Sequence, residues 1–166
     1  FSGSVFKQLD DTFAYLNLCN KTTATIKQLE RVESVDYPEE ALREALLNAI
    51  VHRDYGFSGS IIINVNDDKM EFISMGGLVM GLSTEDIRSG ISQPRNKKLA
   101  EVFHRLRLIE SYGTGIRRIF DLYKDCSLQP TIEVTQNTFK MILPNRNKSV
   151  PTEKKGSKAE KTEQMQ

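Results

Sequence analysis

The sequence contains no tryptophan, only two cysteines and no apolar run approaching the roughly 20 residues that a transmembrane helix needs. Cys19 and Cys126 lie far apart, with no CxxC pair and no histidine at ligand spacing. These absences argue against a disulfide scaffold, a zinc site and a membrane span, and they predict two structural thiols in a cytoplasmic protein. There is also no signal-peptide pattern, and because the chain begins with Phe1 rather than Met we expect a fragment of a longer protein.

The chain also lacks a strong net charge, which bounds its partners. Its 23 Lys and Arg residues nearly balance its 22 Asp and Glu residues, giving a formal net charge of +1. The basic excess lies at the end, where residues 146–166 carry six Lys or Arg against three Glu. Because the remainder is slightly acidic, we do not expect this domain to grip a nucleic-acid duplex over a broad face.

Periodicity and turn residues predict a mixed fold. Apolar spacing predicts helices over 4–19, 38–53, 97–107 and 113–124, with a short helix at 85–87. Alternation and β-branched residues predict strands over 22–34, 60–66, 69–75, 131–136 and 138–144. This order predicts an α+β two-layer sandwich with helices on one face of a mainly antiparallel sheet. We expect one domain over 1–145 and a disordered tail or linker over 146–166.

The segment 38–55, PEEALREALLNAIVHRDY, holds the clearest candidate site. We expect a helix here, with Asp36 as its N-terminal cap. Glu44, Asn48 and His52 are spaced four residues apart, so they project from one stripe of that helix. Polar groups surrounded by aliphatic side chains are costly to bury without partners. The stripe therefore indicates either a pocket where a ligand or hydrated metal supplies partners, or a half-solvated helix edge.

Two glycine segments follow the stripe. Gly76 and Gly77 come directly after a predicted strand, where they either let the backbone approach a ligand or form a turn with positive φ. Gly113 and Gly115 begin a predicted helix, whose exposed N–H groups suit a phosphate. Neither segment is a GxGxxG fingerprint after a strand or a P-loop, so the common dinucleotide and Walker sites are excluded.

In this order, the pattern ExxxNxxxH, a glycine turn after a strand and GxG at a helix start resembles the GHKL ATPases. The segments PEEALREALLNAIVHRDY, GGL and QPRNKKLAEVFHRLRLIESYGTGIRRI are most similar to the ATPase-like domain named after RecG-type helicases. In bacteria that domain typically follows a Schlafen/AlbA-type DNA-binding domain in transcriptional regulators. The resemblance implies a GHKL (Bergerat) fold, ATP and Mg²⁺ as cofactors, and DNA contact through a missing N-terminal domain rather than through this one.

The resemblance also implies residue roles. Glu44 would activate the attacking water, Asn48 would ligate Mg²⁺, and His52 would contact phosphate. Ser74 stands where the superfamily places the aspartate that accepts a hydrogen bond from the adenine amino group, and serine is shorter and uncharged. The other implied nucleotide contacts are Gly76 and Gly77 beside the adenine, Arg95 in the mobile lid, and Gly113, Thr114 and Gly115 at the phosphates.

Two hypotheses for the function follow. The first is an ATP- and Mg²⁺-binding domain of a bacterial transcriptional regulator, hydrolysing ATP slowly, which the retained Glu44 and Asn48 support. The second is a degenerate, non-catalytic module for homodimerisation or ligand sensing, attached to a DNA-binding domain, which Ser74 favours. Arg117 and Arg118 either reach phosphates or complement acidic groups at the surface. Helicase action by this domain is not expected, because no motor motif and no basic face are present.

Overall fold

One layer of the protein is a four-stranded antiparallel sheet, and the computed structural model describes it within residues 1–110 and 113–148. In sheet order the strands are β3 (Ile62–Val65), β4 (Lys69–Met75), β6 (Thr138–Pro144) and β5 (Thr131–Val134). Strands β3 and β4 form one hairpin and β5 and β6 form another, as the sequence predicts. Pairing between β4 and β6 joins the two hairpins, with Phe72 opposite Met141.

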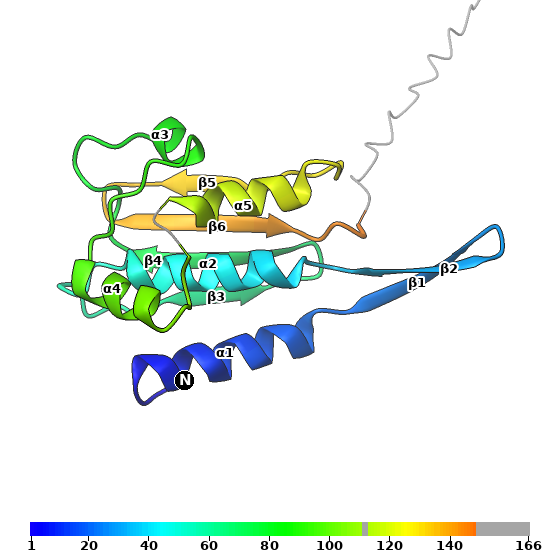
Figure 1. Cartoon of the computed structure of the whole chain (residues 1–166), viewed down its shortest axis with the longest axis horizontal. Helices are drawn as coiled ribbons and strands as arrows, with labels where there is room; N and C mark the ends of the chain where they lie inside the picture. Colours follow the sequence, from blue (N-terminus) through cyan, green and yellow to red (C-terminus); the bar gives the residue numbers. More distant parts are fainter. Residues whose placement is uncertain (111–112, 149–166) are drawn as a thin grey trace, which may run out of the picture.

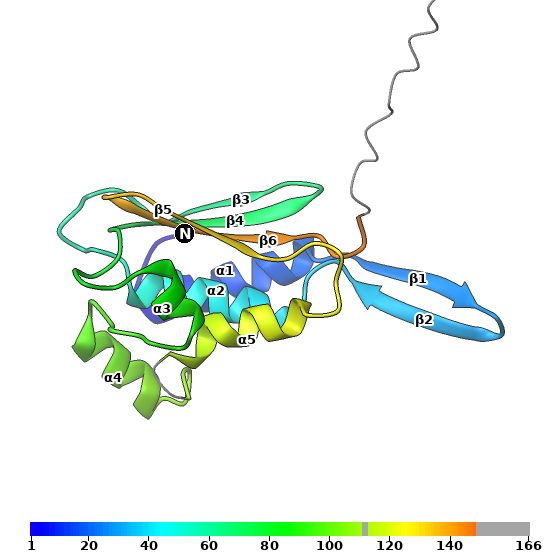
Figure 2. The ribbon, with the colours of Figure 1, turned by 90° about the horizontal axis from the view of Figure 1, so that it is seen from above.

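The second layer consists of helices that lie on one face of this sheet (Figure 2). In the described ranges the helices are α1 (Val5–Cys19), α2 (Glu39–Val51), α3 (Thr84–Arg88), α4 (Lys97–Arg105) and α5 (Thr114–Tyr123). Helix α2 lies between α1 and α5 and contacts both of them (Figure 1). The predicted α+β two-layer sandwich is therefore confirmed. No helix in the described part of the chain has both the length and the apolar character to cross a bilayer.

The core lies between the sheet and α2. Alternate residues of β4 face the helices, and Met70, Phe72 and Ser74 are at most 1% exposed. From the other side, α2 contributes Leu42 and Leu46, which are also almost completely buried. Burying each large apolar side chain of this kind stabilises the fold by about 2 kcal/mol. Since α1, α5, β4 and β6 surround α2, most of its polar side chains have to face other protein groups or a cavity.

The segment predicted as a single strand over 22–34 is a hairpin instead. Its strands are β1 (Thr22–Lys27) and β2 (Glu30–Val35), which pair antiparallel as a separate two-stranded sheet. The turn between them contains neither glycine nor asparagine, and Gln28 adopts a left-handed φ of 58°. Without the usual turn residues the sequence does not reveal this reversal. The hairpin projects from one end of the two-layer body (Figures 1 and 2).

The predicted cap of α2 is also wrong. The residue at the N-cap position is Pro38, and no side chain caps the helix there. The Asp36 carboxylate instead accepts a hydrogen bond of 2.9 Å from the Asn147 side-chain amide. Arg146 donates from its backbone N–H to the Asp36 carbonyl and from Nε to the Val35 carbonyl. The described residues that follow β6 are therefore bonded to the start of α2 and to the base of the hairpin.

The glycine turn after β4 is set by backbone packing. A Cβ atom on Gly77 would lie 2.4 Å from the Thr135 carbonyl oxygen and 2.6 Å from the Gln136 carbonyl oxygen. The turn between β5 and β6 thus approaches Gly77 more closely than any larger residue allows. This contact fixes the start of the connection between β4 and α4 (residues 76–96), which carries α3.

We expect Gly77→Ala to lower the free energy of unfolding by about 3 kcal/mol, because the clash is with backbone atoms that cannot rotate away. Gly81→Ala is the matched control: Gly81 has a φ of 88° but no atom lies within 4 Å of its added Cβ. Its cost should be about 1 kcal/mol of backbone strain. Urea unfolding of both variants measures the difference, and equal losses would contradict the proposed contact.

Candidate functional site

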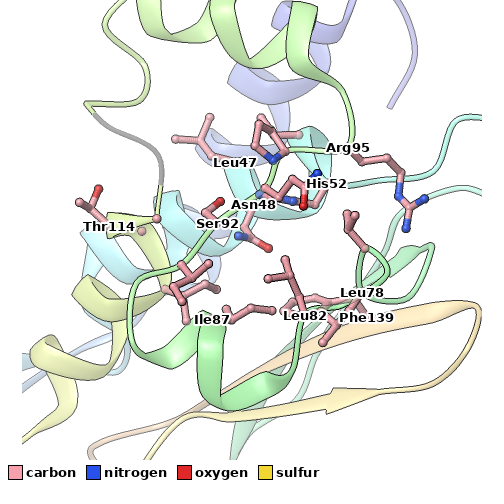
Figure 3. A pocket seen from close by; sticks show the side chains of 18 of the residues that line it. Leu47, Asn48, His52, Leu78, Leu82, Ile87, Ser92, Arg95, Thr114 and Phe139 are labelled. Carbon is pink, nitrogen blue, oxygen red and sulfur yellow. The ribbon is translucent and has the colours of Figure 1, made fainter.

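A cavity of about 90 Å³ lies between α2, the β4–α4 connection and the start of α5. The stripe of α2 forms one wall, since Glu44, Asn48 and His52 all line the cavity. Figure 3 shows the Asn48 and His52 side chains next to each other, with Thr114 on one side and Arg95 on the other. The opposite wall is apolar and includes Leu78, Leu82 and Phe139. The cavity therefore joins a polar wall to an apolar one, as ligand sites commonly do.

The structure brings together nine of the ten residues singled out in the sequence as site residues. The nine that line the cavity are Glu44, Asn48, His52, Gly76, Gly77, Arg95, Gly113, Thr114 and Gly115. Ser74 does not line it, because its side chain points from β4 into the helical layer and is 1% exposed. The position that resembles an adenine contact is therefore packed into the core beside Phe139, its partner across β4 and β6.

Asn48 lies in the middle of the stripe and lines the cavity. No hydrogen bond is made by its side-chain amide to any residue within 1–110 or 113–148, although the side chain is only partly exposed. His52 caps the end of α2 through its backbone N–H, which donates to the Asn48 carbonyl oxygen at 3.0 Å. Burial and, to a smaller extent, the positive charge of Arg95 together lower the pKa of the His52 imidazole to about 4. At neutral pH this wall thus offers an amide and a neutral imidazole.

Glu44 is buried, being 7% exposed, and lies against the first turn of α5. An added Cβ on Gly115 would lie 2.7 Å from the Glu44 Oε2 atom, so glycine lets the helix approach the carboxylate. The other carboxylate oxygen, Oε1, accepts from Arg43 at 3.0 Å and from Arg118 at 3.4 Å. Burial raises the pKa of Glu44, while the two arginines oppose that rise.

Arg118 binds three carboxylates, two from α2 and one from the segment that precedes α5. Its guanidinium lies 3.1 Å from Glu40, 3.4 Å from Glu44 and 2.5 Å from Glu110. The sequence left two alternatives for Arg118, a phosphate contact or pairing with acidic groups. In the structure Arg118 pairs with acidic groups. Arg117 points outward, with 71% of its side chain exposed, and pairs with Asp121 at 3.9 Å.

The β4–α4 connection is fastened at the end of the cavity by residues whose roles the sequence did not reveal. Arg95 donates from Nη2 to the Gly77 carbonyl at 2.9 Å and pairs through Nη1 with Asp54 at 3.4 Å. Its Nε atom is buried and has no hydrogen-bond partner in the described part of the chain. Asn96 donates to the Val51 and Arg53 carbonyls at the end of α2. The sequence signal for this ion pair is the HRDY segment, which places the carboxylate of Asp54 shortly after the end of α2.

The second glycine segment is covered by this same connection. Gly113 has a φ of 90°, and an added Cβ would lie 1.9 Å from the Gly90 carbonyl oxygen. The backbone after α3 therefore packs directly on the start of α5. A phosphate that reached the N–H groups of α5 would need this contact to loosen.

The donor set fits Mg²⁺ only in part. In the described ranges no three His, Cys, Asp or Glu side chains gather as a metal cluster. Mg²⁺ commonly takes one or two protein oxygens and fills its shell with water and substrate phosphates. The Asn48 side-chain oxygen, with the Glu44 carboxylate one turn away on α2, could supply these one or two protein oxygens.

Comparisons with known proteins bear on the family and the fold of the chain. Residues 59–143 match the family model described as "Putative ATP-dependent DNA helicase recG C-terminal". The crystal structure of the DIP2311 protein from Corynebacterium diphtheriae matches with a TM-score of 0.79 and 27% sequence identity, over 86% of this chain. The match covers 30% of the DIP2311 chain, so the present chain corresponds to less than a third of that protein. No curated protein matches the chain.

We expect His52 to make stability depend on pH between about 6.5 and about 4. In this window the unfolded chain binds a proton at His52 that the folded chain does not, so the free energy of unfolding falls as the pH falls. His52→Gln should flatten the curve by about 2–3 kcal/mol. Urea unfolding between pH 7 and 4 measures this for both proteins, and an NMR titration showing a His52 ring pKa near 6.5 in the folded state would contradict it.

Proposed function

The chain belongs to the family of RecG-type C-terminal, ATPase-like domains, and we propose that its cavity binds ATP together with Mg²⁺. The observation that carries the proposal is the Asn48 amide, which lines the cavity without a protein partner in the described residues. An amide that faces a cavity and makes no hydrogen bond to the protein has a donor and an acceptor that a ligand can satisfy. A hydrated cation beside a polyphosphate supplies both an acceptor and a donor.

In the proposed complex α2 would bind the cation and the start of α5 would bind the phosphates. Asn48 would hold Mg²⁺ through its side-chain oxygen, and the N–H groups at Gly113, Thr114 and Gly115 would donate to phosphate oxygens. Mg²⁺ offsets the negative charge of the phosphates when it is bound. His52, neutral at physiological pH, would donate one hydrogen bond without adding a charge.

ATP binding in this site requires the β4–α4 connection to move. The cavity of about 90 Å³ is smaller than the roughly 300–1,000 Å³ typical of small-molecule sites. The contacts that would open are the Asp54–Arg95 ion pair and the packing of Gly90 on Gly113. Opening there would leave the direct contacts of α2 with β4 and β6 in place, because neither of these two contacts lies between α2 and the sheet.

Hydrolysis by this domain would depend on the ion pairs of Glu44. A carboxylate that orients water needs a free oxygen, and Arg43 and Arg118 both bind Oε1. Oε2 faces Gly115, where a side chain larger than hydrogen would come within 2.7 Å of it. We therefore propose slow turnover, limited by this arrangement.

A second candidate function is a non-catalytic module of a DNA-binding transcriptional regulator. The burial of Ser74 outside the cavity favours it, since the residue that resembles the adenine contact then does not reach the cavity. Under this proposal the domain would sense a ligand or join subunits, and DNA would be bound by another part of a longer protein.

Calorimetric titration with a non-hydrolysable ATP analogue and Mg²⁺ tests the first proposal. We expect binding to the wild type and an affinity at least about tenfold lower in Asn48→Ala, because the variant removes the ligand oxygen. Asn64→Ala is the control: it removes an amide from β3, where Asn64 bonds Glu71 outside the cavity. Absence of binding to a folded wild type at millimolar analogue would overturn the ATP proposal and leave the non-catalytic module.

Glu44→Gln separates binding from turnover. The glutamine keeps the size of the side chain but removes the carboxylate, so the analogue should still bind while release of phosphate from ATP falls at least about tenfold. Undiminished phosphate release by this variant would exclude Glu44 as the group that orients water.

A further inference from the structure

The hairpin of β1 and β2 (residues 22–35, here the arm) exposes apolar side chains where it leaves the body. Leu29 at its tip is 100% exposed and Ile26 is 79% exposed. The arm extends away from the main sheet and the helices (Figures 1 and 2). An isolated two-stranded hairpin is at best marginally stable in water, whereas a sheet of more strands gains backbone bonds and side-chain contacts. Pairing with a further strand would therefore stabilise the arm.

The register of the arm shows which backbone groups of β2 are available. Lys27 pairs with Glu30 across a two-residue turn, so these two residues exchange backbone hydrogen bonds. Hydrogen-bonded and non-bonded pairs then alternate along the hairpin. Arg31 and Glu33 fall in non-bonded pairs, so their N–H and C=O groups point away from β1. Arg146 occupies the Val35 carbonyl at the base, so that among the described residues Arg31 and Glu33 are the part of this edge without a backbone partner.

The charges on this edge are complementary to themselves. Arg31 and Glu33 lie on the same side of β2, 2.7 Å apart as an ion pair, and both are largely exposed. If a second copy of β2 runs antiparallel with Val32 on the two-fold axis, Arg31 faces the partner's Glu33 and Glu33 faces the partner's Arg31. The two residues with outward backbone groups then oppose each other, as a bonded antiparallel pair requires. The result is a square of four alternating charges.

Neighbouring registers are disfavoured. Centring the pair on Arg31 or on Glu33 would place like charges directly opposite each other, which destabilises a sheet. The other edge of the arm exposes the backbone of Ala24 and Ile26 and has no charged pair to select a register. In a two-fold pairing of β2 the same patch contacts itself, as in most homodimers.

We propose that two copies of this chain associate through β2, forming a continuous four-stranded antiparallel sheet in the order β1–β2–β2–β1. This register also places the exposed Leu29 beside the partner's Val35, and it leaves the two bodies at opposite ends of the shared sheet. The proposal does not depend on nucleotide binding, since the arm contributes no residue to the cavity.

Sedimentation of the whole chain at 10–100 µM tests the interface through its charges. We expect a dimer for the wild type, and a dissociation constant raised about tenfold or more in Glu33→Arg, which puts like charges opposite each other. The double variant Arg31→Glu with Glu33→Arg should restore the dimer because it exchanges the charges and keeps them complementary. A wild type that is monomeric throughout this range overturns the proposal, as does a dimer that neither variant changes.

A disulfide test locates the axis independently. In a Cys19→Ser, Cys126→Ser background, Val32→Cys should crosslink two chains on mild oxidation, because a residue on the axis faces its own copy in a non-bonded pair with Cα atoms roughly 4.5 Å apart. Thr25→Cys is the matched control, since Thr25 pairs with Val32 inside the arm but lies one strand further from the axis. Equal crosslinking of the two variants, or none for Val32→Cys, would contradict this register.

Discussion

Helix α2 carries polar side chains through the interior of the protein, and the free-energy cost of burying them constrains the rest of the structure. Apolar neighbours from α1, α5, β4 and β6 surround most of the helix, which leaves one stripe for Glu44, Asn48 and His52. Each of the three meets the cost differently. Glu44 is paired with arginines, His52 loses its charge, and Asn48 faces a cavity. The proposed ligand site therefore includes a polar side chain that makes no hydrogen bond to the described residues.

The same constraint explains why the cavity is small in this conformation. Arg118 gathers Glu40, Glu44 and Glu110 at one end, and Arg95 joins Asp54 to the glycine turn at the other. Exposed ion pairs contribute little, but partly buried ones that share a guanidinium hold segments in place. The β4–α4 connection thus closes over the stripe by contacts that a polyphosphate, itself an acceptor for arginine, would compete for. Ligand entry and loosening of these ion pairs are expected to be linked.

Much of the fold could be predicted from the sequence, because helices and hairpins follow local patterns. The short helix predicted at 85–87 lies within α3, which Ser83 and Asp86 begin with a capping box, and the helix predicted over 113–124 has Gly113 as its N-cap. The errors came from long-range contacts: Asp36 bonds Asn147 rather than capping α2, and no local signal marks the turn at Gln28. For the site, the spacing of α2 predicted the stripe. The carboxylates around Arg118 and the burial of Ser74 depend on tertiary packing, which spacing does not encode.

The most direct test of the Asn48 site is NMR with Mn²⁺ in place of Mg²⁺ and a non-hydrolysable ATP analogue. A paramagnetic ion broadens signals from nuclei close to it, so it reports position rather than affinity. We expect the Asn48 side-chain amide to be broadened first, followed by the backbone amides at the start of α5, while the signals of β1 and β2 persist. Broadening that spares Asn48, or that centres on another part of the chain, would contradict the proposed site.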